Sequence, residues 1–259
     1  MKFRILGSVS TVANGLVKPL DGSRQRTLMA VMLINAQQVV TKDQFFAEVW
    51  GDRLPTAPDN ALQAVVMRVR KVLAAEFGER FARERLVTLP DGYAMEIDPD
   101  EIDGHLFQRL TAEAKALVHQ DPAAARELFA QALGLWQGPV LQGVTGGLIC
   151  EGAVAQFEEN RLAAAEARMQ LDIPVLGYAS VISELRKMVS LYPWRERLFE
   201  LLMICLYETG RQAEAVQVYN YLRRRLIEEF GMEPSPNVQK CMMAILHQEP
   251  SIGQLERIC

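Results

Sequence analysis

"PDNALQAVVMRVRKVL" (residues 58–73) has the pattern of one amphipathic helix. Four of its apolar residues recur at helical spacing and form one stripe: Leu62, Val66, Val69 and Leu73. The other faces carry amides and cations: Asn60, Gln63, Arg68, Arg70 and Lys71. Such polar faces either stay in water or lie on an anionic partner. The helix alone does not distinguish these two interpretations, and the rest of the chain is needed.

Charge is unevenly distributed along the 259 residues, whose formal net charge is −4. Residues 1–100 hold 13 Lys/Arg and 12 Asp/Glu, whereas residues 101–259 hold 15 and 20. Residues 60–85 alone hold six cations against three acids. A local basic cluster in an acidic chain is the weaker form of a nucleic-acid footprint.

Short strands and a helix are expected at the start of the chain. Residues 2–12 and 16–20 have strand character, and the Asn-Gly pair at 14–15 is a turn signal. Residues 23–36 read as a helix, with Ser23 as its N-cap. A second helix follows at residues 41–51.

That second helix has a clear start signal, because Thr41 and Gln44 have the spacing of a capping box. After the helix at 58–73, "RLVTLPDGYAMEI" (residues 85–97) is expected to form a hairpin, since Asp-Gly is a strong turn dipeptide. The order is strands, three helices and a hairpin.

We place a domain boundary at the polar segment "DPDEID", residues 98–103. Beyond it the chain is rich in alanine, leucine, glutamate and arginine and reads as all helical. Residues 123–129 and 213–219 look like copies in which small residues precede an aromatic one, as in tetratricopeptide-like helix pairs. The expected fold is therefore mainly α: a winged helix-turn-helix (α+β) at 1–98, followed by an all-α tetratricopeptide-like domain at 99–259.

In a winged helix the third helix enters the DNA major groove and the hairpin approaches the flanking backbone. Asn60 and Gln63 are then candidates for base contacts, since glutamine can pair bidentately with adenine. Arg68, Arg70 and Lys71 are candidates for phosphate contacts, which give affinity without sequence information.

The N-terminus of the first helix is a further candidate DNA contact. Arg24 and Arg26 follow Ser23 at a helix end that already carries partial positive charge, so an anion is expected there. We predict a phosphate clamp made of Ser23, Arg24 and Arg26. The alternative is that these are ordinary solvated cations.

At this point the sequence resembles the Streptomyces antibiotic regulatory proteins, activators of secondary-metabolite clusters. The resemblance covers nearly the whole chain and rests on seven stretches: "RQRTLMAVML", "FFAEVWGDRLPTAPDNALQAVVMRVRKVL", "RLVTLPDGYAMEI", "ALGLWQGPVL", "FEENRLAAAEARM", "YPWRERLFELLMICLYETGRQAEAVQVYNYLRRRL" and "EEFGMEPSPNVQ". It implies an OmpR-type winged helix and a bacterial transcriptional activation domain. It also implies binding to direct repeats near the −35 element, a homodimer at least on DNA, and recruitment of RNA polymerase through sigma region 4 and other subunits.

Two features depart from the family pattern. The hairpin carries Asp91 at its turn and has no arginine over Tyr93–Ile97, so Arg85 and Thr88 on its first strand are the expected backbone contacts. Pro174 is expected to break the helix that begins near Gly152, because proline removes a hydrogen bond and clashes with the preceding turn. From the resemblance we expect the short form of the family.

No other chemistry stands out. His105, His119 and His247 are far apart, and the glycines of "QGVTGGLIC" lack the lysine of a phosphate loop. The four cysteines have no metal-site spacing and fit a reducing cytoplasm, and Cys150 is expected to be packed rather than reactive. We expect no catalytic residue, no metal, no cofactor and no membrane span, and therefore a cytoplasmic protein.

Three classes of function remain to be ranked. The first is a sequence-specific transcription activator of an antibiotic or other secondary-metabolite cluster. The alternative is a helical-repeat protein–protein adaptor with a degenerate winged helix. An enzyme ranks third because no site for one is found. Sequence-specific binding to a promoter fragment separates the first two.

Overall fold

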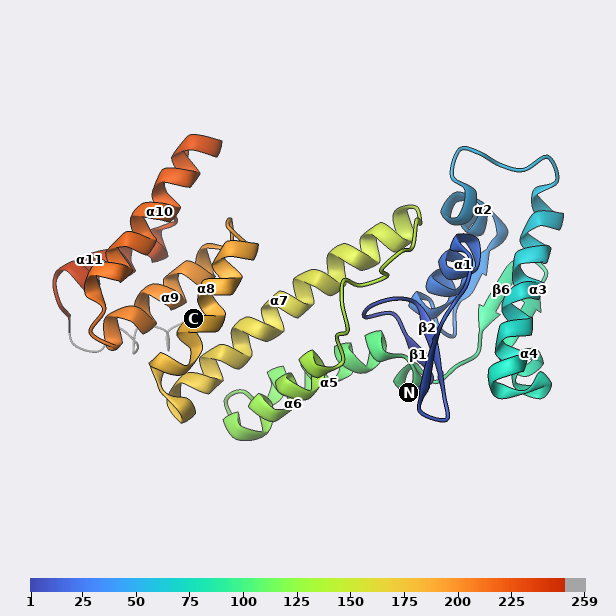
Figure 1. Ribbon diagram of the computed structural model, residues 1–259, viewed down its shortest axis with the longest axis horizontal. Helices are drawn as coiled ribbons and strands as arrows, with labels where there is room; N and C mark the ends of the chain where they lie inside the picture. Colours follow the sequence, from blue (N-terminus) through green and yellow to red (C-terminus); the bar gives the residue numbers. More distant parts are fainter. Residues whose placement is uncertain (250–259) are drawn as a thin grey trace. The chain divides into compact units, whose positions relative to one another are not determined.

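The computed structural model describes residues 1–249 (Figure 1). By its internal contacts the chain divides into two compact units between Ala165 and Glu166. The second unit is entirely helical within the described residues, and the first combines two small sheets with helices.

The first part of the chain alternates short strands and helices, as expected. The strands are β1 (Phe3–Arg4), β2 (Ser10–Ala13), β3 (Leu16–Pro19), β4 (Val39–Thr41), β5 (Leu86–Leu89) and β6 (Gly92–Met95). The helices are α1 (Ser23–Ile34), α2 (Lys42–Trp50), α3 (Pro58–Phe77) and α4 (Glu79–Arg85). The strands form two antiparallel sheets, with the orders β1-β2-β3 and β4-β6-β5. This is a winged helix, with the hairpin β5–β6 as the wing.

Local sequence signals account for most of these boundaries. The capping box at the start of α2 is confirmed, because Thr41 Oγ1 accepts from Gln44 N–H while Gln44 Oε1 accepts from Thr41 N–H. The N-cap assigned to Ser23 is wrong: Gly22 holds that position, and Ser23 is the first residue of the helix. The short helix α4 was not expected; it begins after Gly78, whose φ of 94° ends α3.

The core of the winged helix lies under α3. The expected stripe is buried, and Val65 extends it. In the wing, a Cβ on Gly92 would lie 2.0 Å from the carbonyl oxygen of Val40, so only glycine lets β6 approach β4 this closely. The "DG" turn is therefore needed for strand pairing as well as for chain reversal.

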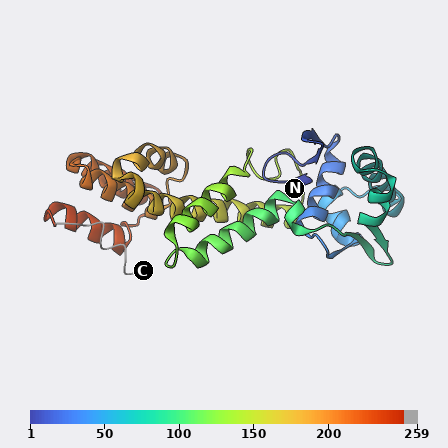
Figure 2. The ribbon, with the colours of Figure 1, turned by 90° about the horizontal axis from the view of Figure 1, so that it is seen from below.

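Helices follow the wing throughout the described residues. They are the 3₁₀ turn η1 (Pro99–Glu101), α5 (Asp103–Leu117), α6 (Pro122–Gly134), α7 (Leu148–Leu176), α8 (Tyr178–Leu191), α9 (Glu196–Glu208), α10 (Gln212–Phe230) and α11 (Pro236–Leu246). Helices α5 and α6 form an antiparallel pair, visible side by side in both views (Figures 1 and 2). In the second unit α9 packs on α8, α10 and α11.

The expected repeat is recognisable in these pairs. Ala125 and Phe129 of α6 are buried, and so is Ala215 of α10. Gly210 turns the chain between α9 and α10 with φ of 76°. One small residue of each copy is therefore buried in its helix pair, as in tetratricopeptide-like pairs, whereas Ala123 and Ala213 are exposed.

The break expected at Pro174 is wrong. Helix α7 continues through Pro174 to Leu176 and ends at Gly177, whose N–H donates to Ile173 O and whose φ is 81°. Proline lacks an N–H and so removes one hydrogen bond, but only two residues of helix follow it. The glycine, not the proline, ends the helix.

Contacts across the polar segment 98–103 join the winged helix to the first helices beyond it. Ile5 N–H donates to Asp103 Oδ1 (2.7 Å), and Leu6 N–H donates to Asp103 Oδ2 (3.2 Å). The carbonyl oxygens of residues 5–7 accept from three N–H groups: Leu141 (2.9 Å), Gln137 (2.8 Å) and Gln142 (2.9 Å). The first compact unit therefore extends past the expected boundary, and a division of function near residue 98 stays a prediction.

Candidate nucleic-acid interface

The face of α3 opposite its buried stripe is exposed. Four of the five polar residues singled out on this helix lie there: Asn60, Gln63, Arg68 and Lys71. Asn60 and Gln63 are three residues apart, and so are Arg68 and Lys71. The two pairs are offset by eight residues, so at about 3.6 residues per turn all four lie on the same side of the helix. The helix therefore presents amides near its N-terminus and cations further along.

Arg70 lies apart from this face. Its Nη2 donates to the carbonyl oxygen of Leu86 (2.8 Å) and to Thr88 Oγ1 (2.7 Å), so it ties α3 to the first strand of the wing. The side chain is half-buried. Arg70 and Thr88 were singled out as DNA contacts, and the structure shows that they bind each other.

Arg85 also supports the wing. Its Nη1 donates to Glu96 O (3.0 Å), and its guanidinium lies 5.9 Å from the ring centre of Phe81. Its other guanidinium nitrogens have no hydrogen-bond partner among residues 1–249. Arg85 is thus held at the base of the hairpin with part of its charge available.

Lys42 is a cation of this region that the sequence pattern missed. It begins α2, its N–H donates to Asp91 O (3.1 Å) at the wing turn, and its Nζ pairs with Asp59 (3.0 Å) at the start of α3. The hydrogen bond that Lys42 donates to the Asp59 carboxylate raises the pKa of Lys42 above its ordinary value. No sequence signal could have found it, because the three residues meet only in the folded chain.

At the N-terminus of α1, two of the three residues expected to form a clamp have partners within the chain. Arg26 Nη1 donates to Leu20 O (3.1 Å), and Arg26 Nε donates to Gly143 O (3.3 Å). Ser23 Oγ lies 3.0 Å from Thr145 Oγ1. Arg24 is exposed, with its guanidinium 5.7 Å from the ring centre of Trp50. The contacts hold the loop at 143–145 against α1. Ser23 and Arg24 are both exposed, and Arg26 is half-buried.

The glycine-rich "QGVTGGLIC" segment has a structural role. The carboxylate of Glu48, a buried residue of α2, accepts from Gly147 N–H (2.8 Å), Ile149 N–H (2.7 Å) and Cys150 N–H (3.2 Å). These are N–H groups at the start of α7, which have no partner within a helix. A Cβ on Gly146 would lie 2.4 Å from Cys150 Sγ, so glycine is required there.

The cysteines and histidines form no reactive site within the part of the chain that the structure describes. Cys150 is buried, and burial together with the hydrogen bond to Glu48 raises the pKa of its thiol. Cys205 and Cys241 are buried too, and Cys259 lies outside the described residues. His105 lies 2.9 Å from Leu33 O. No cluster of three metal-ligating side chains occurs over residues 1–249.

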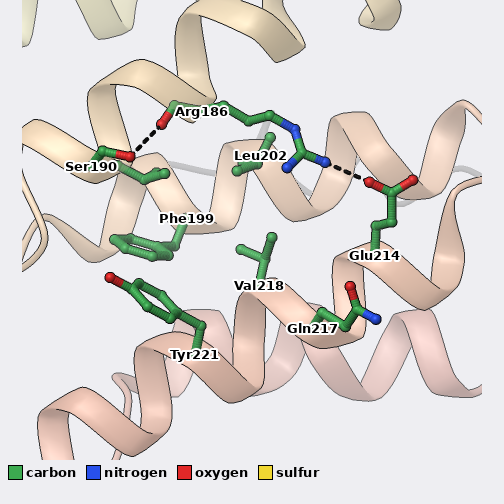
Figure 3. Close-up of a pocket in the computed structure, with 9 residues that line it drawn as sticks. Arg186, Ser190, Phe199, Leu202, Glu214, Gln217, Val218 and Tyr221 are labelled. Atoms are coloured by element: carbon green, nitrogen blue, oxygen red, sulfur yellow. Dashed lines mark hydrogen bonds and ion pairs between the residues drawn. The ribbon is translucent and has the colours of Figure 1, made fainter.

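A cavity of about 270 Å³ lies between α8, α9 and α10 (Figure 3). Its apolar side is formed by Phe199, Leu202 and Val218, and its charged side by the ion pair of Arg186 with Glu214 (2.5 Å). Tyr221 stacks on Phe199 with the ring centres 6.3 Å apart. Because Arg186 and Glu214 pair with each other, the cavity lining presents no unpaired charged side chain.

Across residues 1–249, no helix combines the length and the apolar character that crossing a bilayer requires.

The chain matches two family models. Residues 21–94 match "Transcriptional regulatory protein, C terminal", and residues 102–246 match "Bacterial transcriptional activator domain". The two matches meet between Ala94 and Ile102, and together they cover the winged helix from the loop before α1 and nearly all of the helices beyond it.

Proteins named as regulators match nearly the whole of this chain. Transcriptional regulator RedD of Streptomyces coelicolor is 39% identical over 96% of this chain and 71% of its own. Regulatory protein DnrI of Streptomyces peucetius is 32% identical over 98% of this chain and 95% of its own. Among solved structures, Mycobacterium tuberculosis EmbR, in complex with a low-affinity phosphopeptide, superposes with a TM-score of 0.90 at 25% identity, covering 98% of this chain and 67% of that one. The chain therefore belongs to the Streptomyces antibiotic regulatory protein family of transcriptional activators.

Proposed function

We propose that the protein binds duplex DNA in a sequence-specific manner, with α3 in the major groove. The observation that carries this proposal is the exposed face of α3, where Asn60 and Gln63 precede Arg68 and Lys71. This is the arrangement in which the N-terminal residues of a recognition helix reach base edges and cations reach phosphates.

Base contacts are assigned to the two amides, and phosphate contacts to the two exposed cations. Gln63 can donate to N7 and accept from N6 of adenine, and Asn60 can do the same. Arg68 and Lys71 bind phosphates. Arg85 and Arg24 are secondary phosphate contacts at the wing and at the start of α1. Arg70 and Thr88 act through each other, by fixing the wing against α3.

The division of labour follows the family. We assign DNA binding to residues 1–98 and activation to residues 99–259. Activation consists of recruiting RNA polymerase to promoters with direct repeats near the −35 element, where two copies of the chain bind together. The regulated genes are those of a secondary-metabolite cluster. Membership of the family supports each of these assignments.

The test uses the full chain and an operator fragment from the promoter region of a neighbouring cluster, with a shuffled fragment as the control. Gln63→Ala is expected to reduce the difference in binding free energy between the two fragments by about 1–3 kcal/mol. Lys71→Ala is expected to weaken both equally and to reduce the salt slope by about one. Equal affinity of the unmodified chain for both fragments contradicts the proposal.

A further inference from the structure

The exposed face of α3 has an apolar centre that neither the amides nor the cations explain. Ala64 and Met67 are both exposed, and Met67 keeps 51% of its surface accessible. They follow Asn60 by four and seven residues, so the three share one side of the helix. The centre lies between the amides and the exposed cations.

Met67 is also held from one side. Arg70 Nη1 approaches Met67 Sδ at 4.0 Å, and Arg70 is itself fixed to Leu86 and Thr88 of the wing. The methionine thus stands beside an anchored side chain. Binding becomes more favourable when apolar surface covers an exposed methionine, because this removes the methionine side chain from water.

The edges of base pairs in the major groove are polar, with one exception, the 5-methyl group of thymine. Alanine and other apolar side chains make contact with this group. We infer that Ala64 and Met67 read the 5-methyl group of one or more thymines in the operator. This inference rests on the proposed function, since it requires α3 to lie in the major groove.

The experiment begins with an operator that the full chain itself selects from a pool of random duplex DNA. Footprinting then defines the segment of this operator that the bound chain protects. Each thymine in the protected segment is replaced, one at a time, by deoxyuridine. This change removes the methyl group and leaves the hydrogen-bonding edge intact. At least one replacement is expected to weaken binding about fourfold, the factor for one methyl group lost from an apolar contact.

Variants assign the effect to the residue. Met67→Ala should bind the thymine operator more weakly and show no further loss with deoxyuridine at that position. Met67→Leu should keep the sensitivity, because it keeps the apolar bulk. The matched control is Met243→Ala, since Met243 of α11 is also 51% exposed; it should behave as the unmodified chain.

Each outcome bears on one claim. A selected operator whose deoxyuridine forms all bind as tightly as the thymine form overturns the inference and leaves the proposed function standing. The same holds if Met67→Ala retains the full sensitivity, or if no thymine lies in the protected segment. If no sequence is enriched from the pool, the proposed function fails and the inference fails with it.

Discussion

Arg70 lies on the helix that carries the candidate phosphate ligands, yet its guanidinium binds the chain's own wing. Two hydrogen bonds from a cation, at 2.8 and 2.7 Å, make it a latch between α3 and β5. The helical spacing of cations could not reveal this, because the partners lie 16 and 18 residues away and depend on where the hairpin packs.

Arg70→Lys tests the latch. Lysine keeps the charge but cannot reproduce the fork of guanidinium donors, so the free energy of unfolding should fall by about 1–2 kcal/mol. Lys71→Ala, on the exposed face, should leave stability unchanged. Urea unfolding of both variants measures this. If Arg70→Lys is as stable as the unmodified chain, Arg70 is not a latch.

Asp103 is the second residue whose role comes from the fold. Asp103 is fully buried, and desolvation raises its pKa to about 6. The hydrogen bonds from Ile5 N–H and Leu6 N–H and the charge of Arg4 lower the pKa, but by less than desolvation raises it. The folded chain therefore binds this proton more tightly than the unfolded chain does. The contribution of Asp103 to stability is therefore greatest below about pH 4 and falls as the pH rises to about 6.

Asp103→Asn should remove this pH dependence. The difference in unfolding free energy between the unmodified chain and the variant should fall by about 2 kcal/mol between pH 4 and pH 6.5. The raised pKa corresponds to about 3 kcal/mol over the full titration, and part of that change lies below pH 4. Taking the difference cancels the other carboxylates. A difference that rises over this range, or stays flat, shows that the Asp103 pKa is not raised.

At the scale of elements, the sequence did not predict the link between α2 and the start of α7. The Glu48 carboxylate accepts hydrogen bonds from three backbone N–H groups, in residues about 100 positions away. It satisfies the start of α7 and places a negative charge at the positive end of the helix dipole.

Glu48→Gln should destabilise the chain by about 2–3 kcal/mol, because the amide is uncharged and one of its two ends is a donor. Asp43→Asn, the same change at an exposed position of α2, is the control and should cost under about 0.5 kcal/mol. Thermal or urea unfolding measures both. Equal stabilities for the two variants contradict the role given to Glu48.

The elements also show where sequence patterns suffice. The stripe and the capping box depend on spacings of three and four residues, and both predictions are confirmed. The failures have a different cause. Pro174 was expected to break α7, but the helix end is set by Gly177. Ser23 looked like an N-cap, but Gly22 occupies that position. In both cases a neighbouring glycine, able to adopt positive φ, fixed the boundary.

At the scale of the molecule, the winged helix depends on the chain beyond it. Backbone groups of Ile5, Leu6 and Gly7 bond to residues 137–142 and to Asp103, so residues 1–98 alone lose these partners. Buried backbone groups without partners are costly. The polar segment 98–103 gave no sign of these returns of the chain, and the domain boundary placed there stays a prediction.

A fragment of residues 1–98 should therefore unfold at a lower temperature than a fragment of residues 1–165, which retains them. Circular dichroism of the two fragments gives the comparison. A common melting temperature for the sheet-containing part would show that the contacts with residues 137–142 contribute nothing to its stability.

The proposed mode of DNA binding requires α3 to lie in the major groove. Dimethyl sulfate methylates guanine N7 in the major groove and adenine N3 in the minor groove, and binding of the full chain to a modified operator shows which of the two blocks the complex. We expect N7 methylation to interfere within each half-site, because the proposed mode of binding places the exposed residues Asn60, Gln63 and Met67 against the major-groove edges of the bases. Interference from N3 methylation alone, with N7 methylation tolerated throughout, would contradict the placement of α3.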